Sequence, residues 1–549
     1  MNNNRLKELL IVLVMILIAV FFIELQYIFC KLSETPGLVY LGAVHYPSDY
    51  FYYLSQMIQG KDNFLTSTML FTSEKLTPVY VGWQNVLTGK ILLSLGFLVI
   101  EAYQVAVFIY LTLFLALGYI LLCQYFLKER NKRLLAFFFF LTSTSLWKIN
   151  FNPHGPELAY FWYWYNHGDS LVRFGPTPHH LMANSAFTAL LLLSYFWFAK
   201  KRIKLYMILL FIVCSIILTS ITPVYWGLMV LTLAAIPFVA LTTGGLKAIK
   251  TRLLEFKGKM LINFTPLFFV LLPSIQVAIY VKKVFTLPPY SYSSIWESQQ
   301  YVGVNLYWLI VGSGLVIPLA FLGLKNYIRS SNSGRIVGLI LLTFSSLFYF
   351  SPIYQKLGVT NVRFWSGTIY LIWGALGAEG VFLIISRIKR EAIKKVVIGI
   401  FFLVYLISIL PTYYVNYKAI LKPQLFNSFY YLPKEALIAF QEAAKKGNRD
   451  SVYLVEWPFD EPFPALTGRK SLFGFRLLTI DAENKTQKAF DFFGGKMTDE
   501  EKYDFLKRYK IDYIVGYPWT PGINDLLFLK KEYENNFLGV YKVELEIKK

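Results

Sequence analysis

The chain has few cysteines and few charged side chains for its length. Three cysteines occur in 549 residues, and charged residues make up 16% of the chain. Cys123 and Cys214 lie within apolar runs, so we expect neither a disulfide framework nor a cysteine metal site. Hydrophobic residues reach 56%, aromatic residues 18% and the mean hydropathy +0.48, which is far from the composition of a soluble globular domain. We therefore expect a polytopic membrane protein.

Apolar runs suited to crossing about 30 Å of hydrocarbon at about 1.5 Å per residue recur along the chain. They lie near residues 9–29, 103–125, 134–149, 181–199, 205–222, 224–243, 261–281, 302–323, 336–353, 364–385 and 396–415. The pattern predicts an α-helical protein with about eleven transmembrane helices. The first run is expected to be a retained helix, because Phe29–Leu32 offers no small-residue cleavage site.

Acidic residues are scarce relative to basic ones, 33 against 54, which gives a formal net charge of +21. The basic clusters fall into alternate loops of the eleven-span pattern. Since Lys and Arg collect in cytoplasmic loops, the N-terminus is predicted inside and the C-terminus outside. Because the basic residues follow loop topology and not one surface, nucleic acid is not an expected partner.

The apolar pattern ends near Tyr417, and it divides the chain into two predicted domains. Residues 1–415 are predicted to form the transmembrane domain, with long outer loops at residues 30–102 and 150–180. Residues 416–549 are predicted to form an extracytoplasmic soluble α/β domain. Its expected strands and helices are strands Ser451–Trp457, Ile511–Tyr517 and Asn536–Glu546, and helices Lys434–Lys446 and Asp499–Tyr509.

The two long outer loops hold most of the chemistry, as long loops beside rigid spans usually do. The first contains Asp49 in the aromatic stretch Pro47–Leu54, and residues 50–59 have the spacing of an amphipathic surface helix. The second holds four of the five histidines, and its polar residues include His154, Glu157, His167, Asp169, Arg173, His179 and His180.

These features together resemble the GT-C class of integral membrane glycosyltransferases, whose donors are polyprenyl-phosphate-linked sugars. The resemblance covers most of the chain. It consists of an acid early in the first outer loop, a polar second outer loop and a C-terminal outer domain with the segments Leu466–Arg469 and Lys510–Val515. The tryptophan-rich acidic signature of the oligosaccharyltransferase branch is absent, which argues against transfer of whole oligosaccharides to asparagine.

The resemblance implies a sugar transfer at the extracytoplasmic face of the plasma membrane, to a glycan, lipid or protein acceptor. Asp49 would be the general base of a single inverting displacement. The alternative is that Asp49 caps the helix that follows it. Glu157 and Asp169 of the second loop are the other acidic candidates.

The leaving phosphate needs cationic stabilisation, and Arg173 and Arg363 are the outer-face candidates. Arg363 suits an interfacial anchor equally well. No cofactor is certain. A divalent metal ion held by His154, His167 and His179 is one hypothesis, and hydrogen bonding within the loop explains the same histidines.

Three further hypotheses stay open. Glu24 and Glu379 interrupt apolar spans, as in an ion-coupled transporter. A non-enzymatic envelope assembly protein would use the aromatic outer segments for docking. A polysaccharide polymerase or ligase would be another outer-face glycosyltransferase. Within the C-terminal domain, Glu456–Glu461 and Tyr517–Trp519 place aromatics beside acids, which suits sugar stacking or ordinary loop packing. That domain is expected to bind the acceptor or cover the site.

Overall fold

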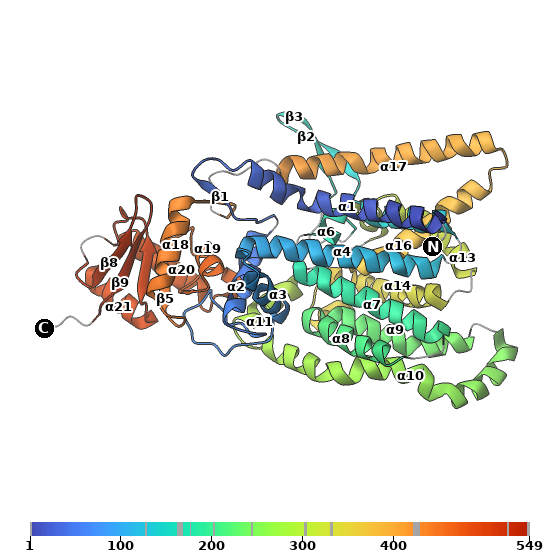
Figure 1. Cartoon of the computed structure of the whole chain (residues 1–549), viewed down its shortest axis with the longest axis horizontal. Coiled ribbons are helices and arrows are strands. Elements are labelled where there is room, and N and C mark those ends of the chain that lie inside the picture. Colours follow the sequence, from blue (N-terminus) through green and yellow to red (C-terminus); the bar gives the residue numbers. More distant parts are fainter. Residues whose placement is uncertain are drawn as a thin grey trace. The chain divides into compact units, whose positions relative to one another are not determined.

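The computed structural model of the chain is mainly helical (Figure 1). It describes residues 3–44, 46–126, 129–161, 168–175, 177–200, 204–242, 245–300, 305–329, 333–420, 429–523 and 526–545. The first half contains α1 (Asn3–Leu32), β1 (Leu38–Tyr40), α2 (Pro47–Ile58), η1 (Gln59–Lys61), α3 (Trp83–Ser94), α4 (Val99–Tyr125), α5 (Arg130–Thr142), β2 (Trp147–Asn152), β3 (Gly155–Tyr160), α6 (Ser170–Arg173), α7 (Pro178–Lys200), α8 (Leu205–Ile221), α9 (Pro223–Thr242) and α10 (Gly245–Val284).

The second half continues the helices and then adds a sheet. Its elements are α11 (Tyr290–Gln299), α12 (Leu306–Ser313), α13 (Val316–Arg329), α14 (Ser333–Phe350), α15 (Ile353–Leu357), η2 (Asn361–Phe364), α16 (Gly367–Ser386), α17 (Glu391–Ile420), β4 (Tyr431–Pro433), α18 (Lys434–Lys446), β5 (Val452–Val455), α19 (Pro462–Thr467), β6 (Lys470–Ser471), η3 (Arg476–Leu478), α20 (Ala482–Phe493), α21 (Asp499–Tyr509), β7 (Tyr513–Gly516), β8 (Leu529–Glu534) and β9 (Gly539–Val543).

Two compact units make up the chain. The helical unit consists of Met1–Ile23, Phe108–Lys282 and Trp296–Ala419, and the sheet unit of Glu24–Val107, Lys283–Ile295 and Ile420–Lys549. The predicted first outer loop therefore packs with the C-terminal segment in one unit. The assignment of residues 1–415 to the membrane and of residues 416–549 to the outside stays a prediction, because packing alone does not locate a membrane.

Among the described residues, six helices are long and apolar enough to cross a membrane, and a bent pair makes up to seven. The six lie in α1, α4, α7, α10, α16 and α17, and the pair is α12 with α13, bent by 108°. Helices α8, α9 and α14 are apolar but shorter. Ten of the eleven predicted spans thus coincide with one of these helices or with the bent pair, and the number of spans and their orientation stay predictions.

The predicted span 134–149 differs from the structure in kind. Helix α5 ends at Thr142, and Trp147–Asn152 pairs with Gly155–Tyr160 as an antiparallel hairpin. The reason is visible in the letters Trp-Lys-Ile-Asn-Phe-Asn, where apolar and polar residues alternate with the period of a strand. The run was long enough for a span only when the strand residues were counted with the helix.

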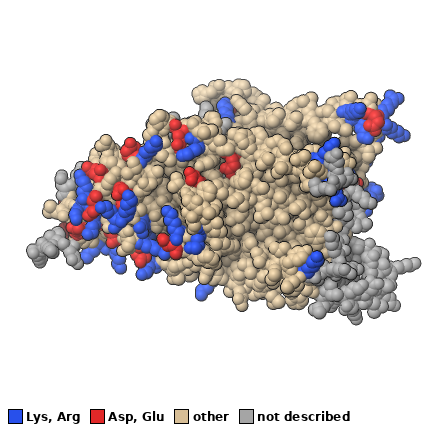
Figure 2. Space-filling model, in the orientation of Figure 1, with Lys and Arg blue, Asp and Glu red and all other residues tan. Residues whose placement is uncertain are grey.

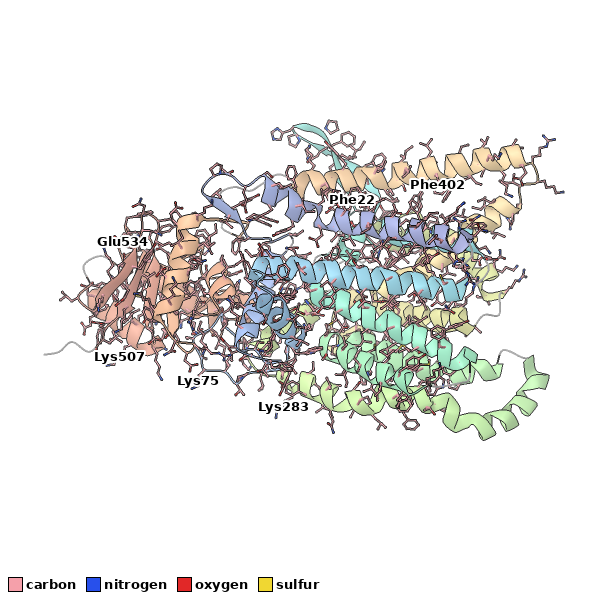
Figure 3. All side chains as sticks on the ribbon, in the orientation of Figure 1. Phe22, Lys75, Lys283, Phe402, Lys507 and Glu534 are labelled. Atoms are coloured by element: carbon pink, nitrogen blue, oxygen red, sulfur yellow. The ribbon has the colours of Figure 1, made fainter. Side chains whose placement is uncertain are left out.

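Small residues let the central helices of the helical unit approach closely. A Cβ at Gly380 of α16 would lie 2.0 Å from the Leu319 oxygen of α13, and one at Gly323 would lie 2.1 Å from the Leu376 oxygen. Close backbone contact of this kind is typical of helices that pack within a membrane. At the periphery, Phe22 of α1 and Phe402 of α17 remain 46% and 38% exposed (Figure 3). These exposed rings suit contact with lipid.

A mixed sheet in the order β6-β5-β7-β9-β8 forms the centre of the C-terminal segment. Strands β6, β5 and β7 are parallel, β9 pairs antiparallel with β7, and β8 pairs antiparallel with β9. A core around Leu454, Ile514 and Phe492 packs between the sheet and its helices. In Figure 2 this segment carries Lys and Arg interleaved with Asp and Glu, whereas the visible face over α4, α7 and α8 is mostly uncharged. The two surfaces are suited to water and to lipid, respectively.

Candidate functional site

Asp49 lies in the first turn of α2 and is partly exposed. The helix begins after Tyr46, which has a left-handed backbone (φ 49°) and makes no side-chain cap hydrogen bond, and Pro47 takes its first position. Proline is well placed there because its nitrogen needs no hydrogen. Tyr46, and not Asp49, is therefore the N-cap residue, and Asp49 stands where the positive end of the helix favours a carboxylate.

Contacts within the sheet unit hold α2 in place. The Tyr50 hydroxyl donates to the Leu41 oxygen at 2.6 Å, and the Tyr50 ring lies 4.8 Å from the ring of Tyr103. Farther along the helix, a Cβ at Gly89 of α3 would lie 2.0 Å from the Met57 oxygen, so α3 approaches through a glycine. The predicted surface helix over residues 50–59 is thus a packed helix, and its first turn has a fixed position.

Two adjacent acids of the C-terminal segment, Asp460 and Glu461, are buried, and Glu461 is within electrostatic range of the first turn of α2. Glu461 immediately precedes α19, a helix that packs against α2, and Asp49 is close enough to act on the ionisation of Glu461. Burial is the largest effect and raises the pKa of Glu461 to about 7, while the nearby Ser48 hydroxyl lowers this pKa and Asp49 raises it. Burial, and then Glu461, raises the pKa of Asp460 well above its ordinary value. Such clusters of shifted carboxyls are common at functional sites.

The burial of Asp460 and Glu461 was not predicted from the sequence, although their surroundings in the sequence indicate it. Asp460 and Glu461 stand between Phe459 and Pro462 in a stretch of aromatic residues and prolines. Adjacent acids in an apolar stretch are unusual for a solvated loop, because charged residues are seldom buried without a partner. The sequence pattern alone predicts them only as acids beside aromatic residues, which suits sugar stacking or ordinary loop packing.

The aromatic residues near them remain partly open to solvent. Trp457 and Trp519 are 55% and 61% exposed, and the Tyr517 ring stacks on Trp519 at 5.1 Å. Glu456 accepts hydrogen bonds from the Tyr517 nitrogen at 2.8 Å and from the Thr520 hydroxyl. Glu456 therefore connects the loops that follow β5 and β7. This contact agrees with loop packing, the alternative to sugar binding for this acid.

The second predicted loop separates into a hairpin and a short helix. His154 and Glu157 are exposed on the β2–β3 hairpin, where Glu157 accepts from Asn152 Nδ2 at 2.9 Å. Asp169 is buried and caps α6 by accepting from the Leu171 nitrogen at 2.9 Å. His167 lies outside the described residues. The two candidate acids of this loop are thus a hairpin residue and a structural cap.

Arg173 is buried within the helical unit and hydrogen-bonds the backbone. Its Nη2 donates to the Phe140 oxygen at 2.7 Å and to the Ser143 oxygen at 2.9 Å, and its Nη1 donates to the Gly168 oxygen at 3.2 Å. The guanidinium also lies 4.7 Å from the centre of the Tyr370 ring. These contacts connect α5, α6 and α16 and give Arg173 a structural role.

Arg363 is accessible and has an anionic partner. Its Nε lies 2.8 Å from Glu297 Oε1 and its Nη2 3.0 Å from Oε2, a bidentate ion pair in which both side chains are about one-fifth exposed. His179 of α7 is within electrostatic range of this arginine. Of the predicted candidates, Arg363 and His179 thus lie within electrostatic range of each other in the helical unit, while Asp49 belongs to the sheet unit.

A metal site does not form from the predicted histidines that are described. Across the parts of the chain that the structure describes, no group of three or more His, Cys, Asp or Glu side chains is placed to hold a metal ion. His154 stands on the exposed hairpin and His179 is buried in α7. We therefore derive no chemical step through a metal ion.

Glu379, which supported the transporter hypothesis, is bound on both oxygens. Lys132 Nζ lies 3.0 Å from its Oε2 and Arg335 Nη1 lies 3.0 Å from its Oε1. All three side chains are mostly buried. A carboxylate held by two cations is a structural ion cluster, and it is poorly suited to pick up and release a transported ion.

Solved structures with a similar fold exist for an archaeal oligosaccharyltransferase, AglB from Archaeoglobus fulgidus. The complex with an inhibitory peptide and a dolichol-phosphate shares 11% identity and a TM-score of 0.53, covering 100% of this chain and 75% of that chain. The apo form shares 12% identity and a TM-score of 0.52, covering 92% of this chain and 69% of that chain. The complex with Zn and sulfate shares 12% identity and a TM-score of 0.52, covering 97% of this chain and 73% of that chain. The chain has a GT-C fold. This confirms the resemblance inferred from the sequence.

Sequence comparison adds nothing to this likeness. No protein-family model matches the chain, and no curated protein matches it in sequence. At 11% to 13% identity the likeness to AglB is one of fold, so activity and site residues rest on the geometry described above.

Proposed function

We propose that the chain is an integral membrane glycosyltransferase that moves one sugar from a polyprenyl-phosphate carrier to an acceptor at the extracytoplasmic face of the plasma membrane. The observation that carries the proposal is a GT-C fold with Asp49 in the first turn of a firmly packed helix. The AglB structures support the donor and acceptor classes, since one contains a dolichol-phosphate and another a tethered acceptor peptide.

In the proposed reaction Asp49 is the general base. Its carboxylate takes the proton of an acceptor hydroxyl while the acceptor oxygen attacks the anomeric carbon. The bond from that carbon to the phosphate oxygen breaks, and its electron pair leaves with the polyprenyl phosphate. One carboxylate is enough for this single displacement, which inverts the anomeric configuration. A retaining mechanism would require a second carboxylate as nucleophile.

Arg363 is the residue that we assign to the leaving phosphate. Guanidinium groups bind phosphate in the same bidentate geometry that Arg363 now uses with Glu297. Donor binding would exchange a carboxylate for a phosphate on the same donors. Arg173 is not part of the proposal, because its two terminal nitrogens already donate to backbone oxygens in the interior.

A release assay tests this function. The full-length protein in lipid nanodiscs is mixed with sugar-linked polyprenyl phosphates and with glycan, lipid and peptide acceptors, and free polyprenyl phosphate is measured by mass spectrometry. The proposal predicts release that depends on the acceptor. Acceptor-independent release would indicate a hydrolase. Movement of a labelled substrate across liposomes without release would favour the transporter hypothesis.

A further inference from the structure

The β2–β3 hairpin has one apolar face and one polar face. Successive side chains of a strand point to opposite faces, and directly paired residues share a face. The apolar face carries Trp147, Ile149 and Phe151 with their partners Tyr160, Leu158 and Pro156. The polar face carries Lys148, Asn150, Asn152 and Glu157. Phe151 is 83% exposed and Ile149 50% exposed, so no described part of the chain covers the outer half of the apolar face.

The base of the hairpin is attached to α17 within the helical unit. Pro411 inside α17 has no N–H, so the Ile407 oxygen four residues earlier lacks its usual helical donor. Trp147 Nε1 donates to this oxygen at 2.9 Å. The Thr412 hydroxyl donates to the Ser145 oxygen at 2.8 Å, just before β2. The hairpin therefore starts from a fixed position on α17.

Helix α17 presents a surface suited to lipid. It is one of the candidate membrane spans, and 11% of the residues in its apolar window are buried. Ile407, which accepts the bond from Trp147, has a side chain that is 52% exposed. In Figure 1 the hairpin starts beside α17 and projects past it, away from the other helices of the helical unit. The apolar face of the hairpin therefore continues a surface that faces lipid.

A hairpin with one apolar face suits the boundary between acyl chains and headgroups. In that position Phe151 enters the acyl chains, while Lys148 and Glu157 of the polar face reach headgroups and water. Aromatic residues such as Trp147 are favoured at the same boundary. Deeper insertion is excluded, because the outer edges of a two-stranded hairpin carry backbone groups without strand partners, which are costly in hydrocarbon.

We propose that the β2–β3 hairpin is an interfacial membrane anchor whose apolar face inserts into the lipid leaflet beside α17. The partner is the lipid of the bilayer: its acyl chains contact Ile149 and Phe151, and its headgroups contact the polar face. The anchor gives the segment between α5 and α7 a fixed depth in the membrane. This inference is independent of the proposed sugar transfer.

Fluorescence quenching by labelled lipids tests the proposal. Phe151→Cys and its neighbour Asn150→Cys, on opposite faces of β2, are labelled with a nitrobenzoxadiazole probe in the full-length protein. The protein is placed in nanodiscs whose lipids carry a nitroxide on the acyl chain. We expect the nitroxide to quench the probe at position 151 several-fold more strongly than the probe at position 150. Labelled wild type measures the background from the native cysteines, Cys30, Cys123 and Cys214.

A measurement on the wild type keeps the test decisive if a cysteine variant fails to fold. A lipid with a photoreactive diazirine in its acyl chain is activated in the nanodiscs, and its adducts are mapped by mass spectrometry. Adducts are expected on Ile149 or Phe151 and not on Asn150. Equal quenching of the two probes, or adducts on both faces or on neither, would overturn the proposal. A probe at position 151 that is shielded from water but not quenched would also overturn it and would indicate a protein partner.

Discussion

The Lys485 ammonium group lies 2.7 Å from Glu74 Oε1 and 2.8 Å from Oε2, and it joins α20 to the loop between η1 and α3. The Lys485 side chain is 1% exposed, and its nitrogen also donates to the Thr72 hydroxyl at 3.2 Å. Within the sheet unit this ion pair holds the middle of the first outer loop against the C-terminal segment. Burial lowers the pKa of Lys485, and Glu74 partly restores it.

Removing the cation should destabilise this attachment. Lys485→Met removes the cation that pairs with Glu74, and breaking a buried ion pair typically costs about 3–5 kcal/mol. Because Glu74 is 36% exposed and can be hydrated, we expect a loss of about 2 kcal/mol in the free energy of unfolding. Thermal unfolding of the purified protein measures it. The double variant with Glu74→Gln should recover part of the loss, and equal stability of Lys485→Met and the wild type would contradict the account.

Arg173 should affect folding more than substrate binding. In Arg173→Met the oxygens of Phe140 and Ser143 lose their donor in the interior, and each unsatisfied buried acceptor costs about 1–3 kcal/mol. We expect a lower yield and a melting temperature reduced by several degrees, with an unchanged KM for the lipid donor in the folded fraction. A raised donor KM at wild-type stability would instead support Arg173 as a ligand of the donor phosphate.

Arg363 should show the opposite behaviour. Hydrogen bonds to charged groups contribute about 1.5–3 kcal/mol, so Arg363→Ala should raise the donor KM about tenfold or more. Glu297→Gln removes the competing carboxylate and should lower the donor KM. Arg476→Ala, an exposed arginine of the sheet unit, is the control. An unchanged donor KM in Arg363→Ala would contradict phosphate binding and would favour Arg363 as an interfacial anchor.

Glu461 should make stability depend on pH. Its pKa is raised in the folded protein, so the folded state holds this proton more tightly than the unfolded state. The resulting stabilisation is complete below about pH 4.5 and is lost as the pH rises through about 7. The melting temperature of the wild type should therefore fall over this window more than that of Glu461→Gln. Parallel melting curves for the two proteins would contradict the shift.

The sequence predicted local elements well where their signals were local. Helix α21 coincides with the predicted Asp499–Tyr509, since Thr498 and Glu501 form a capping box that sets its start. Helix α18 likewise matches Lys434–Lys446 because its apolar residues recur with the helical period. The bend between α12 and α13 was missed, although Gly314, with φ of 71°, stands at that break.

The candidate site was only partly predictable. Asp49 could be singled out because an acid in an aromatic loop is conspicuous by itself. The burial of Glu461 near Asp49 depends on the packing of α19 against α2, two helices far apart in the chain, and no local pattern encodes it. The partners of Arg173 and Arg363 were hidden for the same reason, so their different exposure could not be foreseen.

The central claim is that Asp49 is the general base of sugar transfer. Its most direct test is single-turnover release of polyprenyl phosphate by the wild type and by Asp49→Asn, with Asp62→Asn, an exposed acid of the same loop, as the control. Loss of a general base typically costs about 100-fold or more in rate. We predict that loss for Asp49→Asn and a wild-type rate for Asp62→Asn, with equal melting temperatures for all three proteins. Wild-type release by a folded Asp49→Asn variant would contradict the account.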